Sequence, residues 1–167
     1  MNKNCIRKCS LLSNEAYKND LKSISSNFIE DYGTDTQIHV GLEKNNIYVV
    51  CRGTSSCQDV ISDLKIWRKK CDYLQNTSIH SGFLEQYTAV REQVRNEITS
   101  LMDESIKRVV FCGHSLGAAL ATIAALDYKL QNEKKEWKCL QTQNQNIYKR
   151  QKFISNYKTQ WIYDCIF

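Results

Sequence analysis

The five residues Gly113-His114-Ser115-Leu116-Gly117 constrain the fold of this chain more than any other feature. They follow a short apolar run at residues 109–112, which is typical of a buried strand, and precede an Ala- and Leu-rich stretch at 116–130 with helical spacing. A turn this sharp is strained, and bulky residues at its two glycine positions would collide with the adjacent strand and helix. The pattern therefore predicts a strand, a tight turn and a helix, with Ser115 at the tip.

Ser115 is the candidate nucleophile of this turn, and Gly113 and Gly117 are the glycines that allow it. A serine at a helix N-terminus lies beside N–H groups that favour developing negative charge. One of the donors to an oxyanion must come from the residue after the nucleophile, which is Leu116 here. Because a serine hydroxyl is a weak nucleophile, the site also needs a neighbouring base.

Other segments predict strands and helices that alternate along the chain. Two β-rich runs, at residues 37–42 and 46–51, flank a polar turn and predict an antiparallel hairpin. Helical spacing of apolar residues predicts further helices at 10–26, 55–67 and 82–102. This order favours an α/β fold with a mostly parallel sheet covered by helices.

Three motifs together resemble, in order and spacing, those of the class 3 (fungal-type) lipases of the α/β-hydrolase superfamily. They are Cys51-Arg52-Gly53-Thr54-Ser55, Ile79-His80-Ser81-Gly82-Phe83-Leu84 and the Gly113–Gly117 motif. The resemblance covers residues 30–130 well and 131–164 weakly. It implies a three-layer α/β-hydrolase sandwich with a mostly parallel sheet and an N-terminal antiparallel hairpin, incomplete at the C-terminus. Residues 1–167 would form a single lipase-like domain, with 131–167 as a divergent tail.

The resemblance also implies roles for residues outside the turn. Thr54 would supply the second oxyanion donor beside the Leu116 N–H, although a simple turn residue is the alternative. Asp164 would be the triad acid, and a solvated aspartate near the end of the sequence is equally open. Residues 55–67 would form a lid that makes transient contact with a lipid surface, or else an ordinary helix facing the core.

No histidine follows Ser115 in the sequence, although the α/β-hydrolase order places the base after the nucleophile. His39, His80 and His114 are therefore predicted to have packing or hydrogen-bonding roles. Without an imidazole to take the serine proton, most of the rate is lost. Two functions are retained: a serine ester hydrolase acting on acylglycerols or related lipid esters, and an inactive lipase-like domain that binds lipid or a protein partner or is the remnant of a gene.

Composition excludes several other classes of function. The net charge of +5 is below that of a dedicated nucleic-acid binder, and the basic and aromatic residues of 131–167 match no recognition module. No apolar run approaches the roughly 18 residues of a transmembrane segment, and the N-terminus lacks the apolar stretch of a signal peptide, which predicts a cytoplasmic protein. None of the eight cysteines forms a C-x-x-C pair, so free and mostly buried thiols are expected. No metal or organic cofactor is predicted, and the expected partner is a lipid ester substrate.

Overall fold

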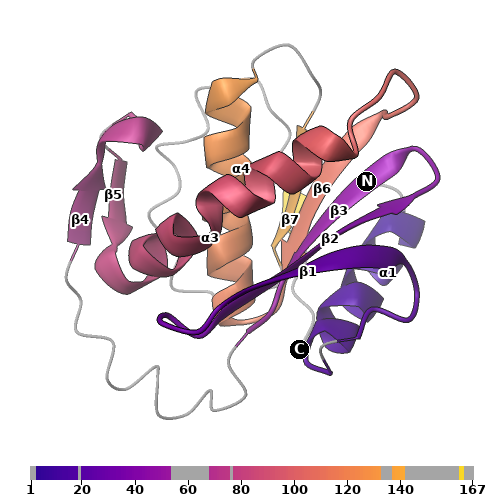
Figure 1. The fold of residues 1–167 in the computed structure, drawn as a ribbon, viewed down its shortest axis with the longest axis horizontal. Helices are drawn as coiled ribbons and strands as arrows, with labels where there is room; N and C mark the ends of the chain where they lie inside the picture. The colour runs from indigo at the N-terminus through magenta and orange to yellow at the C-terminus, as the bar shows by residue number, and fades with distance from the viewer. Residues whose placement is uncertain are drawn as a thin grey trace.

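The computed structural model describes residues 3–18, 20–53, 68–75 and 77–132, together with the backbone of 137–141 and 162–163. Within these residues the chain forms a six-stranded sheet in the order β1-β2-β3-β6-β7-β8 and a separate two-stranded sheet, β4-β5 (Figure 1). The elements are α1 (Lys3–Ala16), β1 (Ser25–Asp31), β2 (Thr36–Glu43), β3 (Asn46–Cys51), β4 (Arg68–Cys71), the 3₁₀ turn η1 (Asp72–Leu74), β5 (Thr77–His80), α3 (Ser81–Ser100), β6 (Arg108–Gly113), α4 (Leu116–Gln131), β7 (Trp137–Gln141) and β8 (Ile162–Tyr163).

The large sheet is antiparallel at one side and parallel at the other. Strands β1, β2 and β3 pair antiparallel, whereas β3, β6, β7 and β8 pair parallel. The chain leaves β3, passes through the small β4-β5 sheet and α3, and returns as β6; it then crosses through α4 to β7. This arrangement agrees with the predicted α/β architecture, in which a parallel region needs helical crossovers.

The central strands are apolar on both faces because helices cover both faces. Alternate residues of β3 and β6 face α3 and α4 on one side, namely Ile47, Val49, Val109 and Phe111. The intervening residues pack with α1 on the other side, namely Tyr48, Val50, Val110 and Cys112. Figure 1 shows α3 crossing in front of α4, with α1 on the opposite side of the sheet. The result is the predicted three-layer sandwich.

The two helices on one face have different amino-acid patterns because they occupy different depths. Helix α4 packs against β3, β6 and β7 and is itself covered by α3, so ten of its residues are buried, most of them alanine or another small or apolar residue. Helix α3 also contacts β1 and β2 and buries a single stripe, Leu84, Tyr87, Val90, Val94 and Ile98. A stripe at three- and four-residue spacing is typical of a helix with one face exposed to water.

The N-terminal part differs from the prediction in two respects. The predicted helix at 10–26 has the wrong bounds, because α1 spans Lys3–Ala16. Strand β1 was not predicted, so the antiparallel part has three strands rather than the two of a hairpin. Only Ile29 of β1 is buried. An edge strand that exposes most of its side chains lacks the apolar alternation by which a strand is recognised.

The other predicted elements are confirmed wherever the structure describes them. The hairpin, the helix at 82–102, the strand at 109–112 and the helix at 116–130 correspond to β2-β3, α3, β6 and α4. The predicted helix at 55–67 lies outside the described residues, as does most of 131–167. The described cysteines are thiols without a disulfide bond, and all but the half-buried Cys5 are buried, as predicted: Cys5, Cys9, Cys51, Cys71 and Cys112.

Candidate active site

The turn around Ser115 has the strained geometry that its sequence predicts. Ser115 lies between β6 and α4 with φ 55° and ψ −123°. A non-glycine residue rarely adopts a positive φ, and such strain is found most often at functional sites. Two backbone hydrogen bonds of 3.0 Å close the turn, from Gly117 N–H to the His114 carbonyl and from Ala118 N–H to the Ser115 carbonyl.

The two glycines of the motif bring three backbone segments into contact. A Cβ added to Gly117 would lie on the carbonyl oxygen of Cys51 and 2.8 Å from the carbonyl carbon of Arg52. A Cβ added to Gly113 would lie 2.5 Å from the carbonyl carbon of Gly117 and 2.7 Å from the Cys51 oxygen. Real Cβ atoms essentially never approach backbone this closely. The end of β3, the end of β6 and the start of α4 therefore pack without room for a side chain at either position.

Leu116 is the first residue of α4, directly after Ser115. The first N–H groups of a helix have no acceptor within that helix, and the helix dipole gives this end a partial positive charge. The Leu116 amide therefore lies at the positive end of the helix dipole. Its predicted role is compatible with this geometry.

Thr54 lies outside the described residues, but Gly53, which precedes it, lies beside the turn. A Cβ on Gly53 would be 2.6 Å from the carbonyl oxygen of His114. Arg52 fixes this segment from the other side: its N–H donates to the Gln37 carbonyl at 3.0 Å, and its guanidinium donates to the Gln37 side chain. The backbone that leads to Thr54 therefore reaches the turn that carries Ser115.

Asp164 also lies outside the described residues. Strand β8 ends at Tyr163, one residue earlier, and pairs parallel with β7, which pairs parallel with β6. The carboxyl ends of parallel strands share one edge of a sheet, where α/β proteins place their ligands. The end of β8 is therefore at the same edge as the end of β6.

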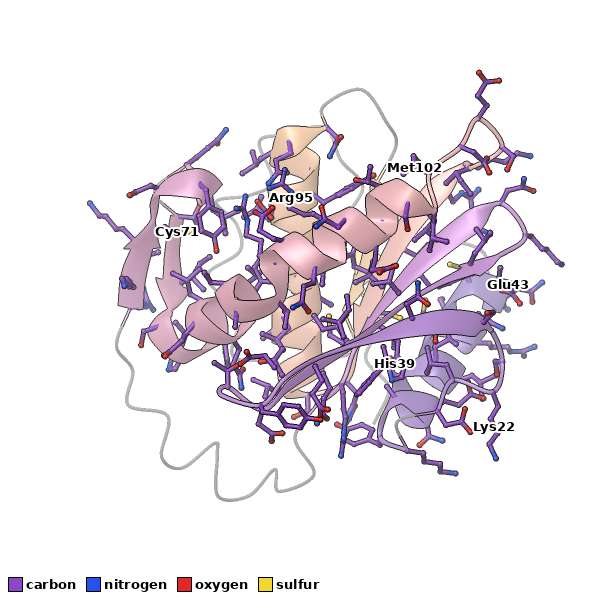
Figure 2. The ribbon with its side chains drawn as sticks, viewed as in Figure 1. Lys22, His39, Glu43, Cys71, Arg95 and Met102 are labelled. Carbon is purple, nitrogen blue, oxygen red and sulfur yellow. The ribbon has the colours of Figure 1, made fainter. Side chains whose placement is uncertain are left out.

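The three histidines contact different aromatic groups. The buried His39 ring packs on Phe28 at 4.7 Å between ring centroids, and the His80 ring packs on Phe83 at the same distance. Figure 2 shows His39 on the side of the sheet that carries α1, consistent with its register opposite Val50. Burial and the charge of Arg52 lower the pKa of His39, which favours a neutral ring. These contacts are compatible with the predicted packing roles.

His114 has a partner that no sequence pattern indicated. The Tyr17 hydroxyl lies 2.9 Å from His114 Nδ1, and the two rings meet edge to face at 5.9 Å between centroids. The same hydroxyl lies directly on Gly53, where it would collide with an added Cβ. Tyr17 follows α1 and is 97 residues from His114 in the sequence, so only the tertiary fold brings them together.

Neither a metal-binding cluster nor a membrane-spanning helix is found in the part of the chain that the structure describes. No cluster of three or more His, Cys, Asp or Glu side chains there could hold a metal ion. Among the same residues, no helix has the length and apolar character to cross a bilayer.

The strain at Ser115 predicts that glycine at this position stabilises the fold. Glycine adopts positive φ without a Cβ clash, so Ser115→Gly is expected to raise the free energy of unfolding by about 1 kcal/mol. Ser115→Ala keeps the clash and is the matched control, with little expected change. Urea unfolding followed by circular dichroism compares the two variants, and equal midpoints would contradict a strained turn.

Known lipases share both sequence and fold with this chain. The family model described as lipase (class 3) matches residues 48–149. The lipase of Rhizomucor miehei is 33% identical over 119 residues, which cover 68% of this chain and 32% of that protein. The chloroplastic phospholipase A(1) DAD1 of Arabidopsis thaliana is 34% identical over 109 residues, which cover 53% of this chain and 24% of that protein.

Two solved structures show the same fold. A triacylglycerol lipase from Penicillium expansum superposes with a TM-score of 0.72 at 24% identity and covers 81% of this chain and 57% of its own. A triacylglycerol lipase whose catalytic centre is formed by a serine protease triad superposes with a TM-score of 0.76 at 19% identity, over 98% of this chain and 71% of its own.

The chain spans about a third or less of the length of the curated relatives named here. The match to the family model nonetheless extends over more than half of the 167 residues and includes the whole of the Ser115 turn. The protein therefore belongs to the class 3 lipase family and has an α/β-hydrolase fold.

Proposed function

We propose that this protein hydrolyses carboxylic ester bonds of acylglycerols or related lipids, with Ser115 as the nucleophile. The observation that carries the proposal is the positive φ of Ser115 at the tip of a strand, turn and helix. The half-buried Ser115 lies at the edge of the sheet, where the hydroxyl of a serine in such a turn can approach an acyl carbon. The relatives described as lipases and the phospholipase support lipid esters as the substrate class.

In the proposed reaction, the Ser115 oxygen attacks the ester carbonyl carbon and a tetrahedral oxyanion forms. The Leu116 N–H and Thr54 donate hydrogen bonds to that oxygen, and Asp164 orients the base. The alcohol then leaves with a proton, and water hydrolyses the acyl-serine. The 55–67 segment would act as a lid at a lipid surface.

The general base of this mechanism is not identified, because no histidine follows Ser115 in the sequence, where α/β-hydrolases place it. His39, His80 and His114 all precede Ser115, and their rings contact Phe28, Phe83 and Tyr17. This observation favours a second candidate function, an inactive lipase-like domain that binds lipid or a protein partner. The two functions differ in whether the Ser115 hydroxyl is activated.

A fluorescent fluorophosphonate probe tests the activation of Ser115 directly, because it reacts covalently only with an activated serine. Labelling of the 167-residue chain is expected, together with turnover of a short-chain p-nitrophenyl ester, and Ser115→Ala should abolish both. His114→Ala, His80→Ala and His39→Ala would then identify the base. A folded chain that is neither labelled nor active would instead support the inactive binding domain.

A further inference from the structure

The proposed oxyanion donors directly follow Gly53 and Ser115 in the sequence, so the spacing between the Gly53 turn and the Ser115 turn must be fixed. Thr54 follows Gly53 after β3, and Leu116 follows Ser115 after β6. Among the described residues, the parallel ladder between these strands ends at the pair Cys51 and Gly113, before Gly53 and Ser115. Catalytic donors must be held within about 0.5 Å of their working positions. Other contacts therefore have to set the distance between the turns.

Tyr17 contacts both turns with a single hydroxyl group. Its oxygen would collide with a Cβ added to Gly53, which would also lie 2.6 Å from the backbone carbonyl oxygen of His114. The Tyr17 oxygen is 2.9 Å from His114 Nδ1, on the residue directly before Ser115. The carbonyl of His114 in turn packs against Gly53 and accepts the Gly117 N–H that closes the Ser115 turn. The hydroxyl thus forms a bridge between the two turns.

The support for Tyr17 comes from the N-terminal helix. Residues Cys9, Leu12 and Ala16 of α1 are buried against the face of the sheet that carries Val110 and Cys112. Tyr17 directly follows the last of these residues, so its backbone is anchored to β6 through α1. The family model matches from residue 48 onward, and Tyr17 lies outside that match.

We infer that Tyr17 is a positioning residue for ester hydrolysis: its hydroxyl fixes the His114 ring and holds the Gly53 turn against the Ser115 turn. This inference rests on the proposed function of Ser115. The hydroxyl forms a hydrogen bond with His114 Nδ1 and does not touch the substrate. Its loss is expected to loosen the spacing of the oxyanion donors while the rest of the fold remains intact.

Tyr17→Phe tests this inference because it removes only the hydroxyl and keeps the ring against His114. Saturation kinetics of fluorophosphonate labelling should show a limiting rate lower by about tenfold, with an unchanged probe concentration at half-saturation. A merely structural role would lower the folded fraction without this split. Tyr32→Phe is the matched control, since the Tyr32 side chain is 87% exposed, and it should label like the wild type.

Nuclear magnetic resonance of the same variants provides a readout that does not need activity. In Tyr17→Phe, the ¹⁵N resonance of His114 Nδ1 and the amide resonances of Gly53 and Leu116 should shift, whereas Tyr32→Phe should leave all of them in place. If the wild type is labelled and Tyr17→Phe reaches the same limiting rate of labelling, the inference is overturned. If the wild type is not labelled, the proposed function fails, and unchanged Gly53 and Leu116 amides would then overturn the positioning role as well.

Discussion

Gly117→Ala is expected to destabilise the protein by about 3 kcal/mol, because small-to-large changes in a packed core cost that much when the neighbours cannot move. The added Cβ would meet the carbonyl group of Cys51 and the carbonyl carbon of Arg52. These are backbone atoms of β3 and the residue after it, and β3 is paired on both sides in the centre of the sheet. No side-chain rotation relieves such a contact. The start of α4 or the end of β3 must shift instead.

The matched control is Gly33→Ala, where the nearest atom to an added Cβ is a side-chain oxygen of Asp31 at 3.4 Å. That distance is an ordinary van der Waals contact, so a change of no more than about 0.5 kcal/mol is expected. Urea unfolding followed by far-UV circular dichroism measures both variants. A Gly117→Ala protein with the unfolding midpoint of Gly33→Ala would show that the turn is not packed as described.

The sequence predicts the centre of the fold well because the apolar pattern of each element there matches how deeply that element is buried. Strand β6 is apolar on both faces, and α4 is apolar nearly all round, since each is covered by other elements. The strain at Ser115 is likewise local, so a five-residue pattern is enough to predict it. These elements depend on their own neighbours in the sequence more than on distant contacts.

Strand β1 and Tyr17 could not be predicted in this way. β1 exists because its backbone pairs with β2, and six of its seven side chains are not buried. Tyr17 acts on a turn 97 residues away, and nothing in its own segment marks it as different from a surface tyrosine. Long-range contacts of this kind produce no periodic pattern of apolar residues from which they could be predicted.

Asp127 is a third feature that the prediction missed, although the sequence contained a signal. It is a charged residue within the apolar stretch of α4, and its side chain is fully buried. A buried charge requires partners, so an aspartate among alanines and leucines indicates a cation elsewhere in the fold. Helical spacing alone placed Asp127 on a helix but did not identify the partner.

The partner is Arg91 on α3, which binds Asp127 through two parallel hydrogen bonds. Arg91 Nε and Nη2 lie 2.8 Å and 2.9 Å from the two carboxylate oxygens. Tyr87 and Gln131 donate to the same carboxylate at 2.8 Å and 2.6 Å, and the Tyr73 ring covers the guanidinium at 4.1 Å. The hydrogen bonds with Asp127 raise the pKa of Arg91, and burial raises the pKa of Tyr87. This network joins α3 to α4.

Arg91→Met is therefore expected to destabilise the protein by about 3 to 5 kcal/mol, because removing one partner of a buried ion pair leaves the other charge uncompensated. The double variant Arg91→Met/Asp127→Leu removes both charges and keeps apolar side chains in their place. It should recover part of the lost stability: apolar replacement of a whole buried pair is often neutral or favourable, but the buried Tyr87 hydroxyl loses its acceptor. The free energy of unfolding in urea measures each variant.

Arg95→Met is the matched control for Arg91→Met, four residues further along the same helix. Arg95 pairs with Glu92 at 2.9 Å, but their side chains are 37% and 65% exposed, against 18% and 0% for Arg91 and Asp127. Water and salt screen an exposed pair, so its loss should cost less than about 1 kcal/mol. If Arg91→Met costs as little as Arg95→Met, Asp127 is not confined to the dry interior between α3 and α4. If the double variant is no more stable than Arg91→Met, the loss arises from the packing of the arginine stem or from the unpaired Tyr87 hydroxyl, and not from the stranded carboxylate.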